Sequence, residues 1–385
     1  MKFMFMVGGV WLCLLIVKVY AYRRFFSPSP LFSRHKALVK VALVAISIGE
    51  LGLFALVDMN LSYTQYFFLG LGAVLSCCLF AACLFGEVAR FTARLVDSKR
   101  VGDEVLDSRR RFFRILADLG VLILFFFFSV RGVSAAVSIP PVKELKLRIP
   151  KLKESKNIAL ISDAHLGRAL GGEFLRGIVE KINSLEVDVV VIVGDLVDDK
   201  IDKLKDELLV LKDLKTKEGV FYVVGNHEYY HGIDSIIKFL KTLGLKVLHN
   251  KNAELDGFNL AGVADLAGLR FNKFEPDIEA AKKGLNPNKP SILLAHQPKF
   301  VSLYDVSDFD LVLSGHTHAG QVFPMSFFVW LSQRYVHGLY DLPKASSEAK
   351  DTRIYVSSGV GFWGPALRFL APSEIVHIRL EPEQA

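Results

Sequence analysis

Long apolar runs dominate the first third of the chain, and shorter ones alternate with polar stretches in the rest. Four of the long runs suit helices of about 20 residues, the length that crosses a hydrocarbon core. They cover residues 3–20, 37–57, 66–85 and 116–138. The pattern predicts an all-α transmembrane region of four helices within residues 1–139, although a cleavable signal peptide is an alternative for the first run.

From residue 156 onward, short runs rich in Val, Ile and Leu alternate with amphipathic stretches. This alternation is typical of β-α-β units around a buried sheet. The expected strands are Ile158–Ser162, Val187–Val193, Val220–Val224, Ile292–Ala295 and Leu311–Leu313. Residues 140–155 open with Pro140-Pro141 and are rich in lysine, so they are predicted to link the helices to an α/β domain over residues 156–385.

Composition supports this division into two parts. A chain of 385 residues with 51% hydrophobic residues is too long for one ordinary domain and too apolar for a purely soluble protein. All four cysteines lie within the first 83 residues, so the second part has no disulfide and no cysteine ligand. The net charge of +7 comes largely from basic residues near the apolar runs, and we expect no nucleic-acid partner.

Basic residues also predict the membrane topology. They gather between the first and second runs and between the third and fourth, whereas residues 58–65 contain no Lys or Arg. The positive-inside rule then puts both basic connections in the cytoplasm. We expect a multi-pass cell-membrane protein whose C-terminal domain is extracytoplasmic, with a cytoplasmic domain as the alternative because lysines also follow the last run.

Two charged residues lie inside the predicted spans. Glu50 is about 13 residues into the second span and Arg131 about 15 residues into the fourth, so they reach similar depth. A pair between them is our hypothesis, because a charge inside a membrane needs a partner. The alternative is that each side chain faces a headgroup or a water defect.

Each predicted strand of the second part ends abruptly in polar residues. In order along the chain, these are Asp163 and His165, then Asp195, then Asn226, His227 and Glu228, then His296, and finally His316 and His318. In open α/β sheets, ligands gather beyond the carboxyl ends of the strands. The five endings are therefore expected to meet in one crevice.

Each ending taken alone has an ordinary explanation, such as a capping Asp, a common turn or a core histidine. Their joint occurrence points to a metal site, since five of the ten histidines lie beside these Asp and Asn residues. A mixture of carboxylate, amide oxygen and imidazole without thiolate suits two divalent cations, with Mn, Fe or Zn all compatible.

The five endings, read as D-x-H, G-D, G-N-H-E, H and G-H-x-H, resemble the signature of the calcineurin-like metallophosphoesterase family over about residues 157–380. The surrounding sequence is similar to the bacterial membrane-attached or exported branch that acts as a phosphodiesterase. The resemblance implies a four-layer α/β/β/α sandwich that holds two divalent metal ions.

The resemblance also implies a role for each site residue. One metal ion would bind Asp163, His165 and His318, the other would bind Asn226, His296 and His316, and Asp195 would bridge the two. His227 would touch the phosphate and assist the leaving group rather than bind metal.

Two positions depart from the family pattern. Glu228 stands where many members have Asp, and Ala319 stands where the similar branch usually has Gly. We expect Glu228 to fix the tautomer of the adjacent His227, and Asp198 to support or cap rather than bind metal.

These observations predict a membrane-anchored hydrolase that acts on a phosphate ester, for example a lipid-linked diphosphate or a cell-envelope compound. A catalytically idle sensor or binding protein, and a transporter with a regulatory domain, are the alternatives. The oligomeric state is left open. The apolar segment Phe323–Leu331 either packs in the core or forms an acyl-binding or membrane-touching lip beside the site.

Overall fold

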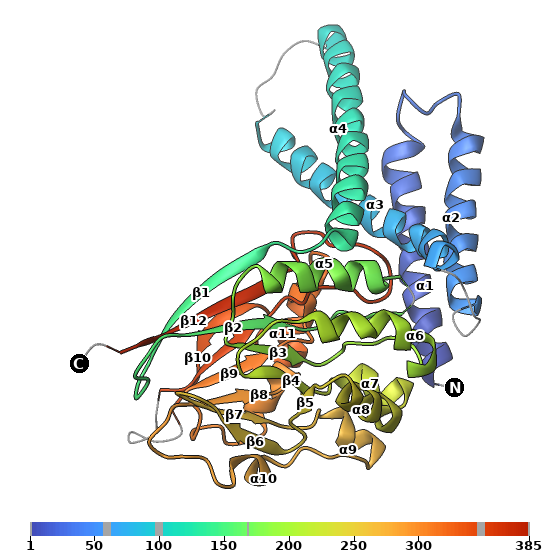
Figure 1. The fold of residues 1–385 in the computed structure, drawn as a ribbon. Coiled ribbons are helices and arrows are strands. Elements are labelled where there is room, and N and C mark those ends of the chain that lie inside the picture. Colours follow the sequence, from blue (N-terminus) through green and yellow to red (C-terminus); the bar gives the residue numbers. More distant parts are fainter. Residues whose placement is uncertain (1, 57–62, 97–102, 168, 345–350, 384–385) are drawn as a thin grey trace. The chain divides into compact units, whose positions relative to one another are not determined.

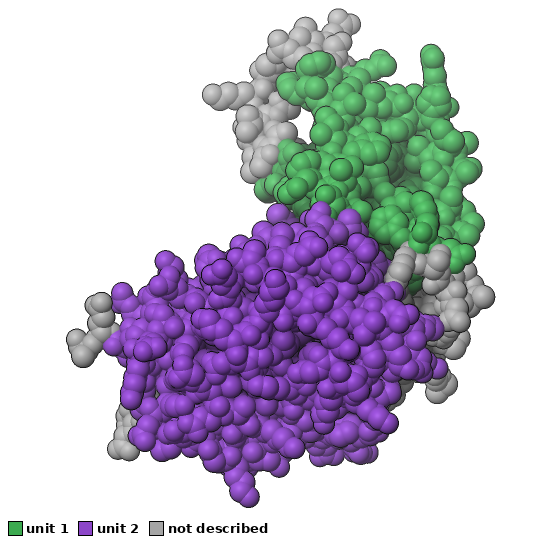
Figure 2. Space-filling view, in the orientation of Figure 1, with its two compact units in different colours: residues 1–134, 364–369 green, residues 135–363, 370–385 purple. Residues whose placement is uncertain are grey.

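The structure is a computed structural model of the whole chain. It describes every residue except 1, 57–62, 97–102, 168, 345–350 and 384–385. The chain divides into two compact units, residues 1–134 with 364–369 and residues 135–363 with 370–385 (Figure 2). All the side chains predicted to form the metal site belong to the second unit.

The first unit is helical (Figure 1). Its long helices are α1 (Lys2–Ala21), α2 (Lys36–Leu56), α3 (Tyr63–Val96) and α4 (Asp103–Val137). They coincide with the four predicted spans, but α3 and α4 continue beyond the apolar runs into the arginine-rich connection. Among the described residues, two segments are long and apolar enough to cross a membrane, Thr64–Phe91 and Arg111–Val137. The region of four spans therefore stays a prediction.

Glu50 is buried between helices of the first unit, but not beside Arg131. Its carboxylate accepts hydrogen bonds from Lys18 Nζ at 2.5 Å and from Ser76 Oγ at 2.6 Å. Arg131 is exposed on α4, so the hypothesis of a Glu50–Arg131 pair is wrong. The π-helical turn Tyr22–Phe26 continues α1 beyond Lys18, and Lys18 forms an ion pair with Glu50.

The second unit contains two six-stranded sheets. The first has the order β1 (Val142–Ile149), β12 (Ile375–Pro382), β2 (Lys156–Ile161), β3 (Val189–Val193), β4 (Gly219–Val223) and β5 (Lys246–Val247). The second has the order β10 (Gly338–Asp341), β11 (Arg353–Val356), β9 (Leu311–Ser314), β8 (Ser291–Leu294), β7 (Asn259–Gly262) and β6 (Lys251–Glu254).

The two sheets share one core of buried aliphatic and aromatic side chains. Val191 and Phe221 of the first sheet and Leu260, Leu294 and Leu313 of the second belong to it, and all are fully buried. Helices α5 (Gly172–Asn183) and α6 (Ile201–Leu208) lie along the first sheet, and α10 (Ile278–Lys282) contacts β6 and β7 of the second (Figure 1). The result is an α/β fold in which sheets form the interior and helices the exterior.

Parallel strands bring the polar endings together. β2, β3 and β4 are parallel neighbours in the first sheet, and β8 and β9 are parallel neighbours in the second. All five lie within two residues of the strands expected from the sequence. Their carboxyl ends face a common edge, as the strand-end rule requires.

The strand β1 was among those not expected. Residues 142–149, inside the predicted linker, form β1, which pairs in parallel with β12 at the edge of the first sheet. Its alternating lysines and leucines leave it exposed on one face. The partner strand lies more than 200 residues away, so no local signal marked this pairing.

Candidate metal centre

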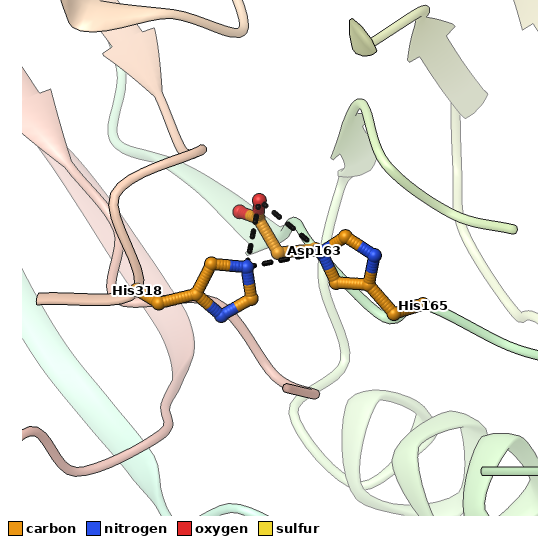
Figure 3. A group of neighbouring side chains, drawn as sticks. All are labelled: Asp163, His165 and His318. Carbon is orange, nitrogen blue, oxygen red and sulfur yellow. Dashed lines mark hydrogen bonds and ion pairs between the residues drawn. The ribbon is translucent and has the colours of Figure 1, made fainter. Parts of the chain in front are cut away.

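The first group of donor atoms comes from the loops after β2 and β9. His165 Nε2 lies 3.0 Å from His318 Nε2, and Asp163 Oδ1 lies 3.5 Å from His318 Nε2 and 4.0 Å from His165 Nε2 (Figure 3). All three side chains are buried. Two imidazole nitrogens and a carboxylate oxygen thus point at one spot from loops 153 residues apart.

The second group comes from the loops after β3, β4, β8 and β9. Asp195 Oδ2 lies 3.2 Å from His296 Nε2, which is 3.3 Å from Asn226 Oδ1. The donor atoms of Asp195, His296 and His316 all lie within 4.8 Å of one another. His296 Nδ1 is 2.8 Å from the carbonyl oxygen of Val193, and this hydrogen bond leaves Nε2 to face the other donors.

Asp195 belongs to both neighbourhoods. Its Oδ2 is 3.9 Å from His165 Nε2 of the first group as well as 3.2 Å from His296 Nε2 of the second. Its Oδ1 accepts a hydrogen bond of 2.8 Å from the backbone N–H of His227, which fixes the orientation of the carboxylate. A carboxylate in this position has two oxygens to offer to two cations.

Glycines make room for the two carboxylates. A Cβ on Gly225 would lie 2.2 Å from Asp195 Oδ1, and a Cβ on Gly315 would lie 2.4 Å from Asp163 Oδ2. Gly359, which follows β11, has φ +77°, and a Cβ there would lie 2.8 Å from Asp163 Cβ. These positions require glycine because the backbone passes against the carboxylates.

The loops also hold several donor residues in left-handed conformations. These residues have φ values of 56°, 47°, 50°, 70° and 49° and are Asp163, His165, Asp195, His316 and His318. Such conformations each cost on the order of 1–3 kcal/mol for residues with a Cβ. They persist because hydrogen bonds join the loops, as from Asp163 N to Gly194 O and from His165 N to Asp195 O, both at 3.0 Å.

Asp198 orients two of the histidines. Its Oδ1 is 3.0 Å from His165 Nδ1 and forms a short hydrogen bond with His227 Nδ1. His227 Nε2 therefore faces the site, 3.9 Å from Asp195 Oδ2. Asp198 thus touches two site histidines through their Nδ1 atoms.

Glu228 does not fix the tautomer of His227, contrary to the expectation. It is fully buried, and its carboxylate accepts hydrogen bonds from the backbone N–H groups of Gly225 at 2.7 Å, Leu196 at 2.8 Å and Asp195 at 3.1 Å. On a helix, adjacent side chains do not face each other, which explains why sequence adjacency misled. Glu228 instead ties the loop after β4 to the loop that carries Asp195.

The electrostatics of the site are dominated by burial and by the acidic side chains. Burial alone would raise the pKa of Asp195, but the adjacent histidines, His296 foremost, hold it well below its usual range. Burial acts against a charged His227, yet Asp195 and Asp198 outweigh this effect and raise its pKa to about 10. Burial, reinforced by the charge of His296, lowers the pKa of His316 to about 3, so its imidazole is in the neutral form that binds metal.

The donor set fits divalent metal ions. Carboxylate, amide oxygen and neutral imidazole are the ligands of borderline divalent cations, and each group here brings its atoms to one point. The Nε2 atoms of His165 and His318 lie 3.0 Å apart, so they can share a proton or both bind one cation.

Three neighbours of the site were not found from the sequence. His231 lies one helical turn after His227 on α7 (Asn226–His231), and its donor atom is within 4.8 Å of those of His227 and Asp198. The i, i+4 spacing was the available signal. The Trp363 ring lies 6.4 Å from the His227 ring, and Glu374 anchors Ser358 N at 3.1 Å beside Gly359. Neither of these two was assigned to the site from the sequence, because they approach it through tertiary structure.

Comparisons with known proteins agree with this geometry. The family model for calcineurin-like phosphoesterases matches residues 156–320. An uncharacterized metallophosphoesterase of Campylobacter jejuni is 39% identical over 95% of this chain and 95% of its own length. A second from Helicobacter pylori is 48% identical over 73% of this chain and 74% of its own.

The name of one animal relative mentions both a transmembrane part and a metallophosphoesterase domain. A transmembrane protein with metallophosphoesterase domain from Danio rerio is 34% identical over 90% of this chain and 80% of its own length. Similarity of this extent agrees with the arrangement of possible metal ligands at the strand ends. The chain belongs to the calcineurin-like metallophosphoesterase family, whose members are metal-dependent hydrolases.

Proposed function

We propose that the chain is a membrane-anchored phosphoesterase with two divalent metal ions that hydrolyses a phosphodiester or diphosphate of a membrane or cell-envelope compound. The observation that carries the proposal is the position of Asp195, whose Oδ2 lies 3.9 Å from one donor group and 3.2 Å from the other. Family membership supports the reaction class. The apolar helices and the Danio rerio relative support the anchoring.

In this proposal seven side chains hold the metal ions. Asp163, His165 and His318 would hold one ion, Asn226, His296 and His316 would hold the other, and Asp195 would serve both. The chemistry that such ions would supply is a lowered pKa of a bound water molecule and charge to neutralise the phosphate. Mn, Fe and Zn are all compatible with these ligands.

His227 is the proposed general acid. Its Nε2 faces the site while Asp198 holds Nδ1, so a proton on Nε2 points toward a bound phosphate ester. The oxygen of water would bond to phosphorus as the bond to the leaving oxygen breaks and that oxygen takes the proton of His227. The proton that the attacking water loses passes to solvent, from which His227 regains one. Asp198 supports the role because its charge stabilises the imidazolium.

Hydrolysis of soluble reporter esters tests the proposal. The full chain in detergent should cleave bis(p-nitrophenyl) phosphate and p-nitrophenyl phosphate with Mn²⁺ and lose this activity with a chelator. Faster cleavage of the diester supports the phosphodiesterase assignment, and faster cleavage of the monoester contradicts it. A chain that retains metal but cleaves neither ester would instead be a catalytically idle binding protein.

A further inference from the structure

Helix α11 (Met325–Gln333) exposes an apolar surface next to the metal site. It begins seven residues after His318, and its sequence MSFFVWLSQ contains no charged residue. The side chains that form the α11 surface are 48–61% exposed and are Met325, Phe327, Phe328, Trp330 and Leu331. This segment therefore does not pack in the core, which was one of the two expectations for it.

Two polar side chains of α11 face the domain. Gln333 is buried, where its Oε1 accepts from Lys299 N at 3.2 Å and its Nε2 donates to Gln297 Oε1 at 3.4 Å. Ser326 lies against Gly320, so closely that a Cβ there would be 2.5 Å from Ser326 Cα. Ser326 and Gln333 are two helical turns apart and share one side, which leaves Phe327, Phe328 and Leu331 on the other.

This arrangement is the reverse of an ordinary surface helix, which buries its apolar side. Exposing a large apolar side chain instead of burying it forgoes about 1.5–3 kcal/mol. Packing within the domain therefore does not account for these side chains, and an apolar environment outside the domain does.

The chemistry of α11 matches a lipid surface. Helices that lie in the interfacial region of a bilayer place Trp, Phe and Leu in it, and α11 exposes these residue types and has no acidic residue. Exposed Lys299 and Arg334 lie at its C-terminal end, where they complement anionic headgroups. The same chain has segments long and apolar enough to span a membrane, so the proposed anchoring would tether the domain to a bilayer.

We infer that α11 inserts its apolar side into the surface of the membrane in which the chain is anchored. The inference rests on the anchoring part of the proposed function and is independent of the proposed chemistry.

The helix is also joined to the site. α11 packs against the turn His318–Gly320, and Gln321, in the same loop, bonds the backbone of Trp363 at 2.9 and 3.2 Å. The Trp363 side chain is 56% exposed and lies beside His227. Insertion of α11 thus holds the site at the level of the lipid headgroups.

Tryptophan fluorescence tests the inference, because the chain has three tryptophans, Trp11, Trp330 and Trp363. The full chain with Trp11→Phe and Trp363→Phe keeps Trp330 as its reporter. It is reconstituted into vesicles of phosphatidylcholine and phosphatidylglycerol, with or without bromine on the acyl chains. We expect brominated lipid to quench most of the Trp330 emission, and acrylamide in the water to quench little of it.

Leu209 offers a matched control. It is 45% exposed and lies in the turn Leu209–Asp213, which packs on α5 along the other sheet. With all three native tryptophans changed to Phe, Leu209→Trp should be quenched by acrylamide and not by brominated lipid. Phe327→Ser, Phe328→Ser and Leu331→Ser together should shift Trp330 to this control behaviour while the circular dichroism spectrum is retained.

Two results overturn the inference. Quenching of Trp330 by acrylamide alone would show that α11 lies in water, and shielding from both quenchers would show that protein covers it, either a second copy or another part of the chain. Flotation of the chain with the vesicles tests the anchoring separately. A chain that floats with an unquenched Trp330 contradicts only this inference, whereas a chain that does not float contradicts the anchoring and the inference with it.

Discussion

At the scale of single residues, side chains that are not proposed as metal ligands set the positions of those that are. Asp198 bonds the Nδ1 atoms of both His165 and His227, and Glu228 ties together the loops after β3 and β4. Such partners orient ligands and raise their basicity. The sequence indicated that acidic residues support the site, but not which group each one contacts.

Replacing Asp198 with Ala should weaken metal binding, because His165 then loses the acceptor that fixes its ring. We expect an affinity loss of about 10–100-fold, measured by titration of the metal-free chain. Asp199→Ala is the control, since Asp199 bonds Lys203 on the surface at 3.0 Å instead of a site histidine. Equal losses in the two variants would contradict the role given to Asp198.

Replacing His227 with Ala should lower kcat by about 10²–10⁴-fold and leave the metal content unchanged, because its side chain donates a proton and binds no metal in the proposed mechanism. Steady-state rates and elemental analysis check the two parts. His249→Ala is a control, since this histidine packs against Phe274 outside the site. Loss of metal from the His227 variant would reassign His227 as a ligand.

Gly359 and Gly338 provide a test of the close packing around Asp163. Both have positive φ, but a Cβ at Gly359 would lie 2.8 Å from Asp163 Cβ, whereas a Cβ at Gly338 meets no atom within 4 Å. Gly359→Ala should therefore lower the free energy of unfolding by about 1–3 kcal/mol more than Gly338→Ala does. Similar effects, measured by thermal unfolding, would mean that backbone strain rather than packing limits the position.

At the scale of elements, strands with strong local patterns were predictable and the others were not. β3 and β9 are continuous runs of Val, Ile or Leu ahead of polar residues, and their positions follow from the sequence. β1 is a strand because it pairs with β12, which lies at the other end of the domain's sequence. The exposure of α11 could not be predicted from the sequence either, because an apolar run has the same composition whether it is buried or faces outward.

The helical unit provides a prediction about paired charges. Glu50→Leu should destabilise the unit by about 3–5 kcal/mol, because it leaves Lys18 buried without its acidic partner. Lys18→Met combined with Glu50→Leu should recover most of the loss, since no charge then stays buried. Thermal unfolding of the full chain in detergent measures both. Arg131→Gln, at an exposed position, should have little effect, and an effect as large as that of Glu50→Leu would contradict the assignment of partners.

At the scale of the whole molecule, the sequence pattern identified most of the candidate site because its residues follow predictable strands. Asp163, Asp195 and His296 each stand directly beyond a buried apolar run, so the strand-end rule brought them together without any knowledge of the fold. The contacts of Trp363 and Glu374 depend on how the last loops return to the site, and no local rule describes that path.

The central claim is that side chains from both sheets together hold two metal ions. Elemental analysis of the purified full chain after loading with Mn²⁺ and removal of unbound metal tests it directly. We predict about two equivalents of metal per chain, as a two-metal phosphoesterase requires, and the loss of at least one of them in Asp195→Ala. A well-folded chain that retains no metal, or an Asp195→Ala variant that retains as much as the parent, would contradict the claim.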